Sequence, residues 1–384
     1  MAPEMAKETA FGSDFRKFID GLKGSATLTA VRRRAFDSFS ATGFPTPKLE
    51  DWKYTNVSPF VAENWVVDAN GAARSGEDAA ADQLTAFNFE RNGFTALNLA
   101  FARVAVLRIA KETVVEEPIE LHFEGDEGKA IFPHIVLIAE AGSRSTIVET
   151  YASPAKSCTN AAVQIIVEDN ASVTHYRVQK ESPDAFHYGV TEVSLGRGSH
   201  YDATNIALGG ALSRHDIELK FMAEGGEAWV DGLYMLNDTQ HHDTHSIIDH
   251  TVPNCTSHQN YKGVLNDRSR AVFNGKVFVR ENGHGTDAQQ QNKNLLLSND
   301  ARVDTKPQLE IFNDDVKCSH GATVGQLEEE ELFYLLTRGL PNNLARNLLT
   351  YGFAEEVISK IGIESIRAEL DAAVLNRLNV KLEV

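Results

Sequence analysis

The chain of 384 residues contains few cysteines and comparatively few basic residues. The three cysteines, Cys158, Cys255 and Cys318, are far apart and odd in number, which favours free thiols in a reducing compartment over a disulfide framework. Lysine and arginine number 37 against 54 aspartates and glutamates, so the formal charge of −17 repels phosphate backbones and anionic membrane surfaces. We therefore expect no nucleic-acid partner and no membrane partner.

Long apolar segments and common nucleotide motifs are also missing. The first residues, MAPEMAKETAFGSDF, contain no signal-peptide apolar run, and Arg103 and Arg108 interrupt the most apolar later stretch. The sequence has no G-x-x-x-x-G-K-[ST] loop, no G-x-G-x-x-G between strand and helix, no G-x-S-x-G and no CxxC. These absences predict a cytoplasmic protein that does not itself hydrolyse ATP.

Residues 1–95 are predicted to form an N-terminal helical region with an extended segment. Apolar residues recur at helical spacing in two successive stretches, Phe15, Phe18, Ile19 and Leu22, then Leu28, Val31, Ala35 and Phe39. The following GFPTPKLEDWKYTN carries two prolines beside Trp52 and Tyr54, which favours an extended linker anchored on a surface by its aromatics. Residues 68–82, DANGAARSGEDAAAD, are small and polar and predict a mobile connection.

Residues 96–322 show a β pattern with a fixed period. Four successive segments each consist of a β-rich arm, a short turn and a second β-rich arm. Their turn centres are Gly142, Asn170, Gly198 and Gly226, which are 28 residues apart three times over. Such a period indicates stacked repeats, so we predict a mainly β fold, a β-solenoid of about eight coils and, at ~4.8 Å per coil, roughly 38 Å long.

The period does not continue to the end of this part of the chain. Later turn candidates at 267–269 and 299–301 break the spacing, so we expect the regularity to be lost after residue 230. A β-sandwich with a turn about every 8 to 12 residues is the alternative fold.

Residues 323–384 are predicted to form a C-terminal helical domain. Thr323 and Gln326 have the spacing of a capping box, and residues 328–331 are four glutamates, which a helix dipole favours in the first turns. Gly339 and Pro341 are expected to end that helix. Two more apolar stripes follow at helical spacing: Leu344, Leu348 and Tyr351, then Ile366, Leu370, Val374 and Leu378.

A cluster of histidines is the first candidate site. The stretch QHHDTHSIIDHTVPNCTSHQ contains His241, His242, His245, His250, Cys255 and His258. Imidazole and thiolate bind zinc and iron well, so a metal site is one hypothesis, with His242, His245 and His250 as candidate ligands. Strand alternation, however, places His241 and His245 on one face with Asp243 between them and His242 on the other. Hydrogen-bonded histidines on adjacent coils are the alternative.

The stretch KCSHGATVG is the second candidate site. If it begins as a strand, Cys318 and His320 share one face about 6.5 to 7 Å apart, with Ser319 on the other. The pair could approach one ion together, but two ligands do not complete a tetrahedral site. A nucleophile–base pair would lack an oxyanion donor and an orienting group. A role in the core or at an edge therefore stays open.

Several segments resemble the SufD branch of the SufB/SufD family, the scaffold subunits of the SufBCD iron–sulfur cluster assembly complex. They are AVFNGKVFV, DAQQQNKNLLLSNDARVDTKPQLEIFNDDVKCSHGATVG, LFYLLTRGL with the closing helices, and the earlier GFPTPKLEDWKYTN. The similarity runs from residue 44 to beyond 350 and is densest at 271–325. The cysteine-rich N-terminal pattern often present in SufB is absent.

This resemblance implies a right-handed parallel β-helix between helical ends, in a non-catalytic scaffold subunit that passes clusters to apo-proteins. It implies pairing with SufB through the β-helix and binding of the ATPase SufC through the C-terminal helices. His320, with the neighbouring thiol of Cys318, would hold a transient iron–sulfur cluster or iron at the SufB interface. No tightly bound cofactor is expected in the isolated chain, which could form a homodimer through the same surface. The alternative is a metal-dependent β-solenoid enzyme that uses the histidines and cysteine of residues 241–258.

Overall fold

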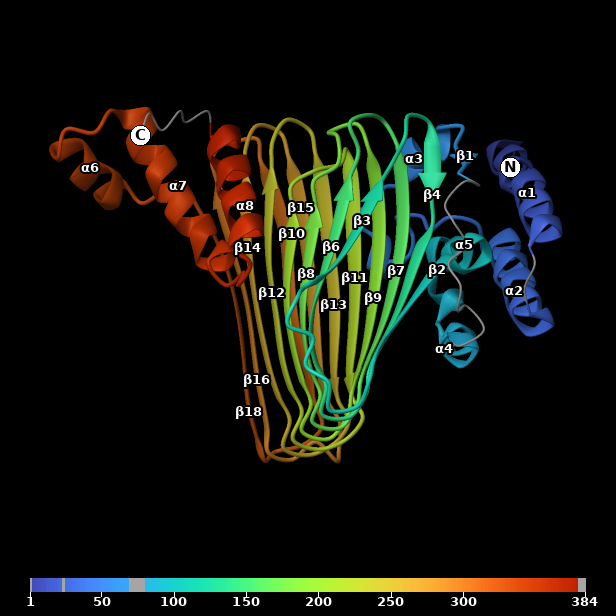
Figure 1. Ribbon diagram of the computed structural model, residues 1–384. Helices are drawn as coiled ribbons and strands as arrows, with labels where there is room; N and C mark the ends of the chain where they lie inside the picture. The colour runs from blue at the N-terminus through green and yellow to red at the C-terminus, as the bar shows by residue number, and fades with distance from the viewer. Residues whose placement is uncertain (1, 23–24, 69–79, 379–384) are drawn as a thin grey trace.

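The computed structural model describes residues 2–22, 25–68 and 80–378 and consists of a parallel β-helix with helices at both ends (Figure 1). The N-terminal helices lie against one sheet, and the last two C-terminal helices pack on the middle coils of the other. Most of the predicted connection at 68–82 falls outside the described residues. The mainly β, parallel solenoid architecture predicted from the period is therefore confirmed, with about eight coils.

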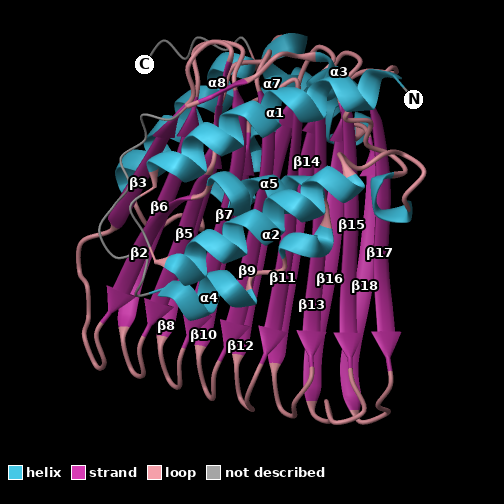
Figure 2. Cartoon of the chain, turned by 90° about the vertical axis from the view of Figure 1, so that its right-hand side faces the viewer, coloured by secondary structure: helices cyan, strands magenta, loops and turns pink. Residues whose placement is uncertain are grey.

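The N-terminal region covers the outer face of one sheet (Figure 2). It contains α1 (Ala2–Gly21), α2 (Ala26–Thr42), the 3-10 turn η1 (Glu50–Trp52), α3 (Ser58–Ala62), β1 (Val66–Val67), α4 (Ala81–Ala86), the 3-10 turn η3 (Phe89–Arg91) and α5 (Gly93–Phe101). The predicted apolar faces of α1 and α2 are confirmed, because Phe15, Ile19, Val31 and Phe39 are all buried. Burying such side chains is the main force that holds these helices on the sheet.

Trp52 anchors the extended segment, as the sequence predicts. Its ring is 4% exposed and stacks on Phe94 and Tyr188, with ring centroids 5.7 and 6.1 Å away. The guanidinium of Arg214 lies 3.8 Å from the centre of the Trp52 ring, and Thr55 donates a hydrogen bond to Asp243. The segment is therefore fixed to the β-helix by aromatic stacking and by a buried charge network.

Two parallel sheets form the walls of the β-helix. The ten-stranded sheet, sheet A, contains β1 and β2 (Arg103–Ile109), β4 (Lys129–Ile131), β5 (Pro133–Ala139), β7 (Cys158–Val167), β9 (Phe186–Leu195), β11 (Leu212–Phe221), β13 (His241–His250), β15 (Arg270–Val279) and β17 (Arg302–Ile311). The eight-stranded sheet, sheet B, contains β3 (Ile119–Glu124), β6 (Arg144–Ala152), β8 (Ser172–Gln179), β10 (His200–Ala207), β12 (Glu227–Leu236), β14 (Thr256–Leu265), β16 (Thr286–Leu296) and β18 (Val316–Gly325).

The turn residues explain why the period is visible in the sequence. Gly142, Asn170, Gly198 and Gly225 all have positive φ at the same corner of successive coils, a conformation that glycine and asparagine tolerate best. Side chains alternate along each strand between the interior of the β-helix, which we call inward, and the outer faces. Inward valine, isoleucine and leucine side chains fill the half of the interior next to this corner.

The strict spacing of 28 residues is lost after residue 230, as expected, but the coils themselves continue. Phe186, Leu212, His241, Arg270 and Arg302 are register partners, so the coils continue with repeats of 26, 29, 29 and 32 residues. The candidate turns at 267–269 and 299–301 lie at the opposite corner, where β14 and β16 end, and so do not interrupt the coils. The alternative of a β-sandwich is wrong, because every strand pair described is parallel.

Three helices follow the last strand: α6 (Glu329–Thr337), α7 (Asn342–Ile358) and α8 (Glu364–Arg377). The capping box predicted at Thr323 and Gln326 is wrong. Thr323 lies within β18, where it pairs with Lys293 of β16, and α6 has no side-chain cap. Gly339, with φ of 90°, and Pro341 follow α6 as expected. α7 and α8 bury apolar side chains against the outer face of sheet B, whereas α6 buries none of its residues and stands away from the strands (Figure 1).

Among the described residues, no helix combines the length and the apolar character that crossing a bilayer requires.

Candidate functional site

The last coil leaves both sheets with an open edge. β18 is the terminal strand of sheet B and pairs with β16, and β17 is the terminal strand of sheet A and pairs with β15. Within the described ranges neither strand has a second partner. Each therefore presents a row of unpaired backbone N–H and C=O groups, to which another chain can add a strand.

Cys318 and His320 lie at this open edge. Register pairs Cys318 with Ala288 and His320 with Gln290, both of which are fully buried inward residues of β16. Cys318 is half-buried and packs against the apolar core, whereas His320 is exposed. Burial raises the pKa of the Cys318 thiol. The arrangement is a thiol and an imidazole on one face of an edge strand. Further ligands could come from a chain that adds to this edge.

The inward histidines of the 241–258 cluster are held by hydrogen bonds, although Nδ1 of His250 has no partner among the described residues. A ring nitrogen of His242 lies 2.7 Å from Oγ of Ser213 and the other lies 3.0 Å from Oγ1 of Thr244. His250 bonds to Ser257 at 2.8 Å and stacks on Phe221. Burial lowers the pKa of His242 to about 3 and that of His250 to about 4. Both rings are therefore neutral at physiological pH.

The outward histidines of this cluster belong to the network that anchors the Trp52 segment. His241 bonds to Thr55 at 2.9 Å, and His245 lies 3.0 Å from a carboxylate oxygen of Asp243. Burial would raise the pKa of Asp243, but His245 and Arg214 outweigh it and lower that pKa far below its usual range. Asp243 is therefore an ionised partner for three neighbours, and the sequence-based expectation that His241 and His245 share a face with it is confirmed.

The remaining two members lie elsewhere. His258 is on the outer face of sheet B, where it stacks on Trp229 with ring centroids 5.1 Å apart. Cys255 is buried in a turn and donates its thiol hydrogen to backbone carbonyls. The six residues thus do not converge on one point, and within the described ranges no group of three or more His, Cys, Asp or Glu side chains could hold a metal ion.

A buried network of charged side chains escaped the sequence analysis. Glu149 accepts a short hydrogen bond from His175, and Glu181 lies 2.9 Å from His187, which also contacts Arg177. All five side chains are almost inaccessible to solvent. Four of them point inward, and Glu181 follows the end of β8. The signal was present as polar residues at alternate positions of HYRVQKE, but alternation alone does not distinguish a polar interior from an outer face.

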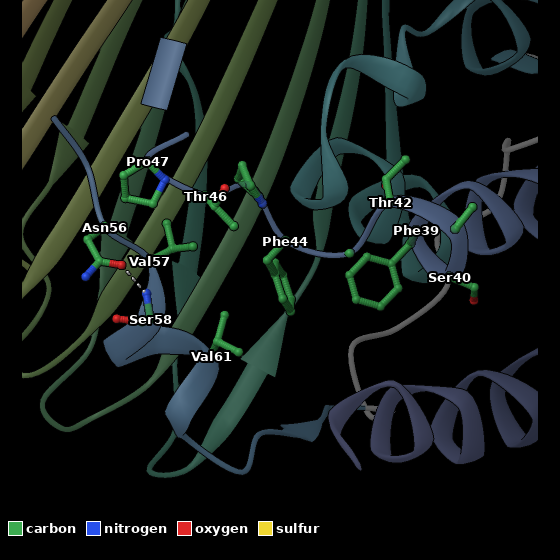
Figure 3. Close-up of a pocket in the computed structure, with 13 residues that line it drawn as sticks. Phe39, Ser40, Thr42, Phe44, Thr46, Pro47, Asn56, Val57, Ser58 and Val61 are labelled. Carbon is green, nitrogen blue, oxygen red and sulfur yellow. Dashed lines mark hydrogen bonds between the residues drawn. The ribbon is translucent and has the colours of Figure 1, made fainter. Parts of the chain in front are cut away.

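The pocket at the end of α2 has a volume of about 440 Å³ (Figure 3). Its lining comes from the end of α2, the chain that follows it and α3, and includes Phe39, Phe44 and Val61. None of the lining side chains is an acid, a base or a thiol. The pocket therefore offers hydroxyl groups but no acid or base that would activate them.

α6 and the start of α7 present a mixed acidic and apolar surface. Glu329, Glu330 and Glu331 occupy the first turn of α6. The exposed apolar side chains on these helices are Phe333, Tyr334, Leu336, Leu344 and Leu348, of which Phe333 is 67% exposed. An apolar surface of this kind is typical of a protein–protein contact.

Two family models cover most of the chain. Residues 122–353 match the SufBD core domain of SUF-system iron–sulfur cluster assembly, and residues 9–83 match the SufBD protein N-terminal region. The fold and the matches define a component of iron–sulfur cluster assembly. The chain belongs to the SufB/SufD family.

Known relatives match most of the chain. A SufBD family iron–sulfur cluster assembly protein of Synechocystis sp. is 35% identical over 348 residues, which span 86% of this chain and 75% of that protein. The iron–sulfur cluster assembly protein SufD of Escherichia coli is 30% identical over 381 residues, with 88% and 90% covered. SufD of Bacillus subtilis is 29% identical over 304 residues, with 74% and 67% covered. The resemblance inferred from the sequence motifs is thus confirmed.

Proposed function

We propose that the chain is a non-catalytic scaffold subunit of a cytoplasmic complex that builds iron–sulfur clusters. In this proposal the open edge formed by β17 and β18 pairs with SufB, and His320 with Cys318 supplies this chain's share of the ligands. The exposed surface of α6 and α7 binds the ATPase SufC. The cluster, or iron on its way to a cluster, is cargo and is passed on to apo-proteins.

The observation that supports this proposal is the position of Cys318 and His320. Thiolate and imidazole both ligate iron in iron–sulfur clusters, but two side chains leave a four-coordinate site incomplete. Their place on an edge strand that is paired on one side only would let a partner chain supply the missing ligands. A site divided between two chains can release its cluster when the chains move apart, which suits a scaffold.

The test is His320→Ala in the complex assembled with SufB and SufC homologues. We expect the complex to form and the visible absorption of the reconstituted cluster to be lost. His122→Ala is the matched control, because His122 is also exposed and lies on β3, the strand at the other end of sheet B. Cluster absorption that stays unchanged in His320→Ala would remove His320 from the assembly site.

A further inference from the structure

A row of side chains leads from the interior of the β-helix to His320. Gln259 of β14, Gln290 of β16 and His320 of β18 are register partners. Neighbouring strands are about 4.8 Å apart, so each of these side chains lies directly beside the next. Gln259 and Gln290 are almost completely buried, whereas His320 is exposed. The row therefore connects a fixed interior to the candidate ligand.

Hydrogen bonds determine which way the amides face. Gln290 donates from Nε2 to Oε1 of Gln259 at 2.7 Å, and Gln259 donates from Nε2 to Oγ of Ser246 at 2.8 Å. The Gln290 amide nitrogen is thus used on the side away from the open edge, and the Gln259 amide nitrogen is used across the interior by β13. Within the part of the chain that the structure describes, Oε1 of Gln290 is buried and accepts no hydrogen bond.

The backbone of the opposite sheet holds the Gln290 amide in place. A Cβ atom added to Gly275 of β15 would lie 2.4 Å from Nε2 and 2.8 Å from Cδ of Gln290. The side chain therefore reaches across the interior into space that only glycine leaves free. Because a buried carbonyl without a donor is unfavourable, a rotation of the exposed His320 ring that brings a ring N–H to this oxygen would satisfy it.

We propose that Gln290 is the positioning residue of His320, and that its Oε1 accepts the hydrogen of one ring nitrogen of His320. The bond selects one tautomer and leaves the other ring nitrogen, with its lone pair, directed at the open edge. Ligating histidines commonly donate their second ring N–H in this way, which fixes the ring and increases its basicity. The use of the second nitrogen as an iron ligand rests on the proposed function, whereas the bond itself does not.

The test is NMR spectroscopy of the full-length chain alone with ¹⁵N-labelled histidine. The signals of His320 are assigned by their absence from the spectrum of His320→Ala. In the unmodified protein we expect a ring N–H of His320 that exchanges slowly enough with water to be observed at neutral pH. The ring of His122, which is exposed at the far end of the same sheet, is the comparison. A His320 ring that exchanges as fast as that of His122 would overturn the proposal without any variant.

Two variants separate the bond from a general effect on folding. Gln290→Glu retains an acceptor oxygen at the same position, so the slowly exchanging ring N–H of His320 should persist. Gln290→Met keeps the length but removes the acceptor, so the tautomer ratio of His320 should move toward that of His122. Gln289→Met is the control, because Gln289 is the adjacent residue and points outward. If Gln290→Met changes the tautomer ratio of His320 no more than Gln289→Met does, the proposal fails.

The consequence for cargo is measured separately. In the assembled complex, Gln290→Met should reduce retention of iron or cluster about 10- to 100-fold, the range for loss of an outer-shell partner. If the bond is present in the isolated chain but His320→Ala leaves the cluster unchanged, the proposed function fails and the positioning of His320 stands. If His320→Ala removes the cluster but the His320 ring shows no protected N–H, the positioning by Gln290 fails and the proposed function stands.

Discussion

The ring of Tyr261 lies against Gly232, its register partner on the neighbouring strand. A Cβ atom at Gly232 would lie 2.1 Å from a carbon of this ring, and Gly263 has the same relationship to Tyr234. Two glycines and two tyrosines thus form reciprocal pairs between β12 and β14. The tyrosines are fully buried, so neither ring can move into solvent.

Gly232→Ala should therefore destabilise the β-helix. The added methyl group displaces a ring held by the core, and overpacking of this kind costs about 1 to 3 kcal/mol. Urea denaturation measures the loss. Gly321→Ala is the control, since no atom lies within 4 Å of a Cβ at that strand glycine. Equal stability of the two variants would contradict the packing argument.

Glu192 makes stability depend on pH. Burial raises its pKa to about 7, and the neighbouring Glu218 adds to the shift although Arg91 opposes it. Because the folded protein holds this proton more tightly than the unfolded chain does, the contribution of Glu192 is full at acid pH and is lost as pH rises from about 4.5 to 7.

Glu192→Gln should flatten that pH dependence. Relative to the parent protein, the variant should gain stability between pH 5 and pH 8, by an amount on the order of 2 kcal/mol. Unfolding free energies at the two pH values measure the difference. Glu227→Gln, at an exposed position, supplies the control. A variant that loses relative stability over this range would show that the Arg91 ion pair dominates.

Phe312 tests the open edge. It directly follows β17 and is 57% exposed, so Phe312→Asp should leave the fold intact and weaken pairing with SufB, or self-association of the isolated chain, at least tenfold. Sedimentation with and without the SufB homologue measures both. Met222→Asp is matched in exposure, 56%, but lies beside a middle coil. Equal effects of the two substitutions would place the interface elsewhere.

Phe333 tests the helical surface. Because α6 buries none of its residues, Phe333→Asp should preserve the thermal stability of the chain. Recovery of the SufC homologue by co-purification should fall about tenfold or more, since exposed aromatic side chains dominate many interfaces. Leu49→Asp is the control, because Leu49 lies in the N-terminal part of the chain and is 52% exposed. Full recovery of SufC with Phe333→Asp would exclude this face as its contact.

His242 distinguishes a structural histidine from a metal ligand. His242→Ala removes a fully buried ring with two hydrogen bonds and leaves Ser213 unpaired, so stability should fall by about 2 to 4 kcal/mol. The metal content of the purified protein should not change. A stoichiometric zinc or iron that disappears in His242→Ala would instead support the alternative of a metal-dependent enzyme.

The sequence was most informative where backbone conformation restricts residue type. Positive φ at Gly142, Asn170 and Gly198 admits few residues, so the corner of each coil was visible as a fixed period. The same restriction explains why the end of α6 at Gly339 and Pro341 was predicted. Its beginning was not, because a threonine suits an extended strand as well as a helix cap, and strand pairing with β16 decided between them.

The candidate site was only partly predictable. Alternation was sufficient to place Cys318 and His320 on one face and to separate His241 from His242. It could not reveal Gln290 as a neighbour of His320, because their adjacency depends on a repeat that had drifted from 28 to about 30 residues in the last coils. Nor could it show that Asp243 is shared by Thr55 and Arg214, which lie far apart in the sequence.

The two ends of the β-helix differ in strand length, and this limits how copies can assemble. β2 and β3 have seven and six residues, whereas β17 and β18 have ten each. If the last coil of one molecule stacked on the first coil of another, several backbone groups would be left unpaired at every junction. Pairing of two last coils matches ten residues with ten and consumes both edges, so growth stops at two subunits instead of continuing into a fibre.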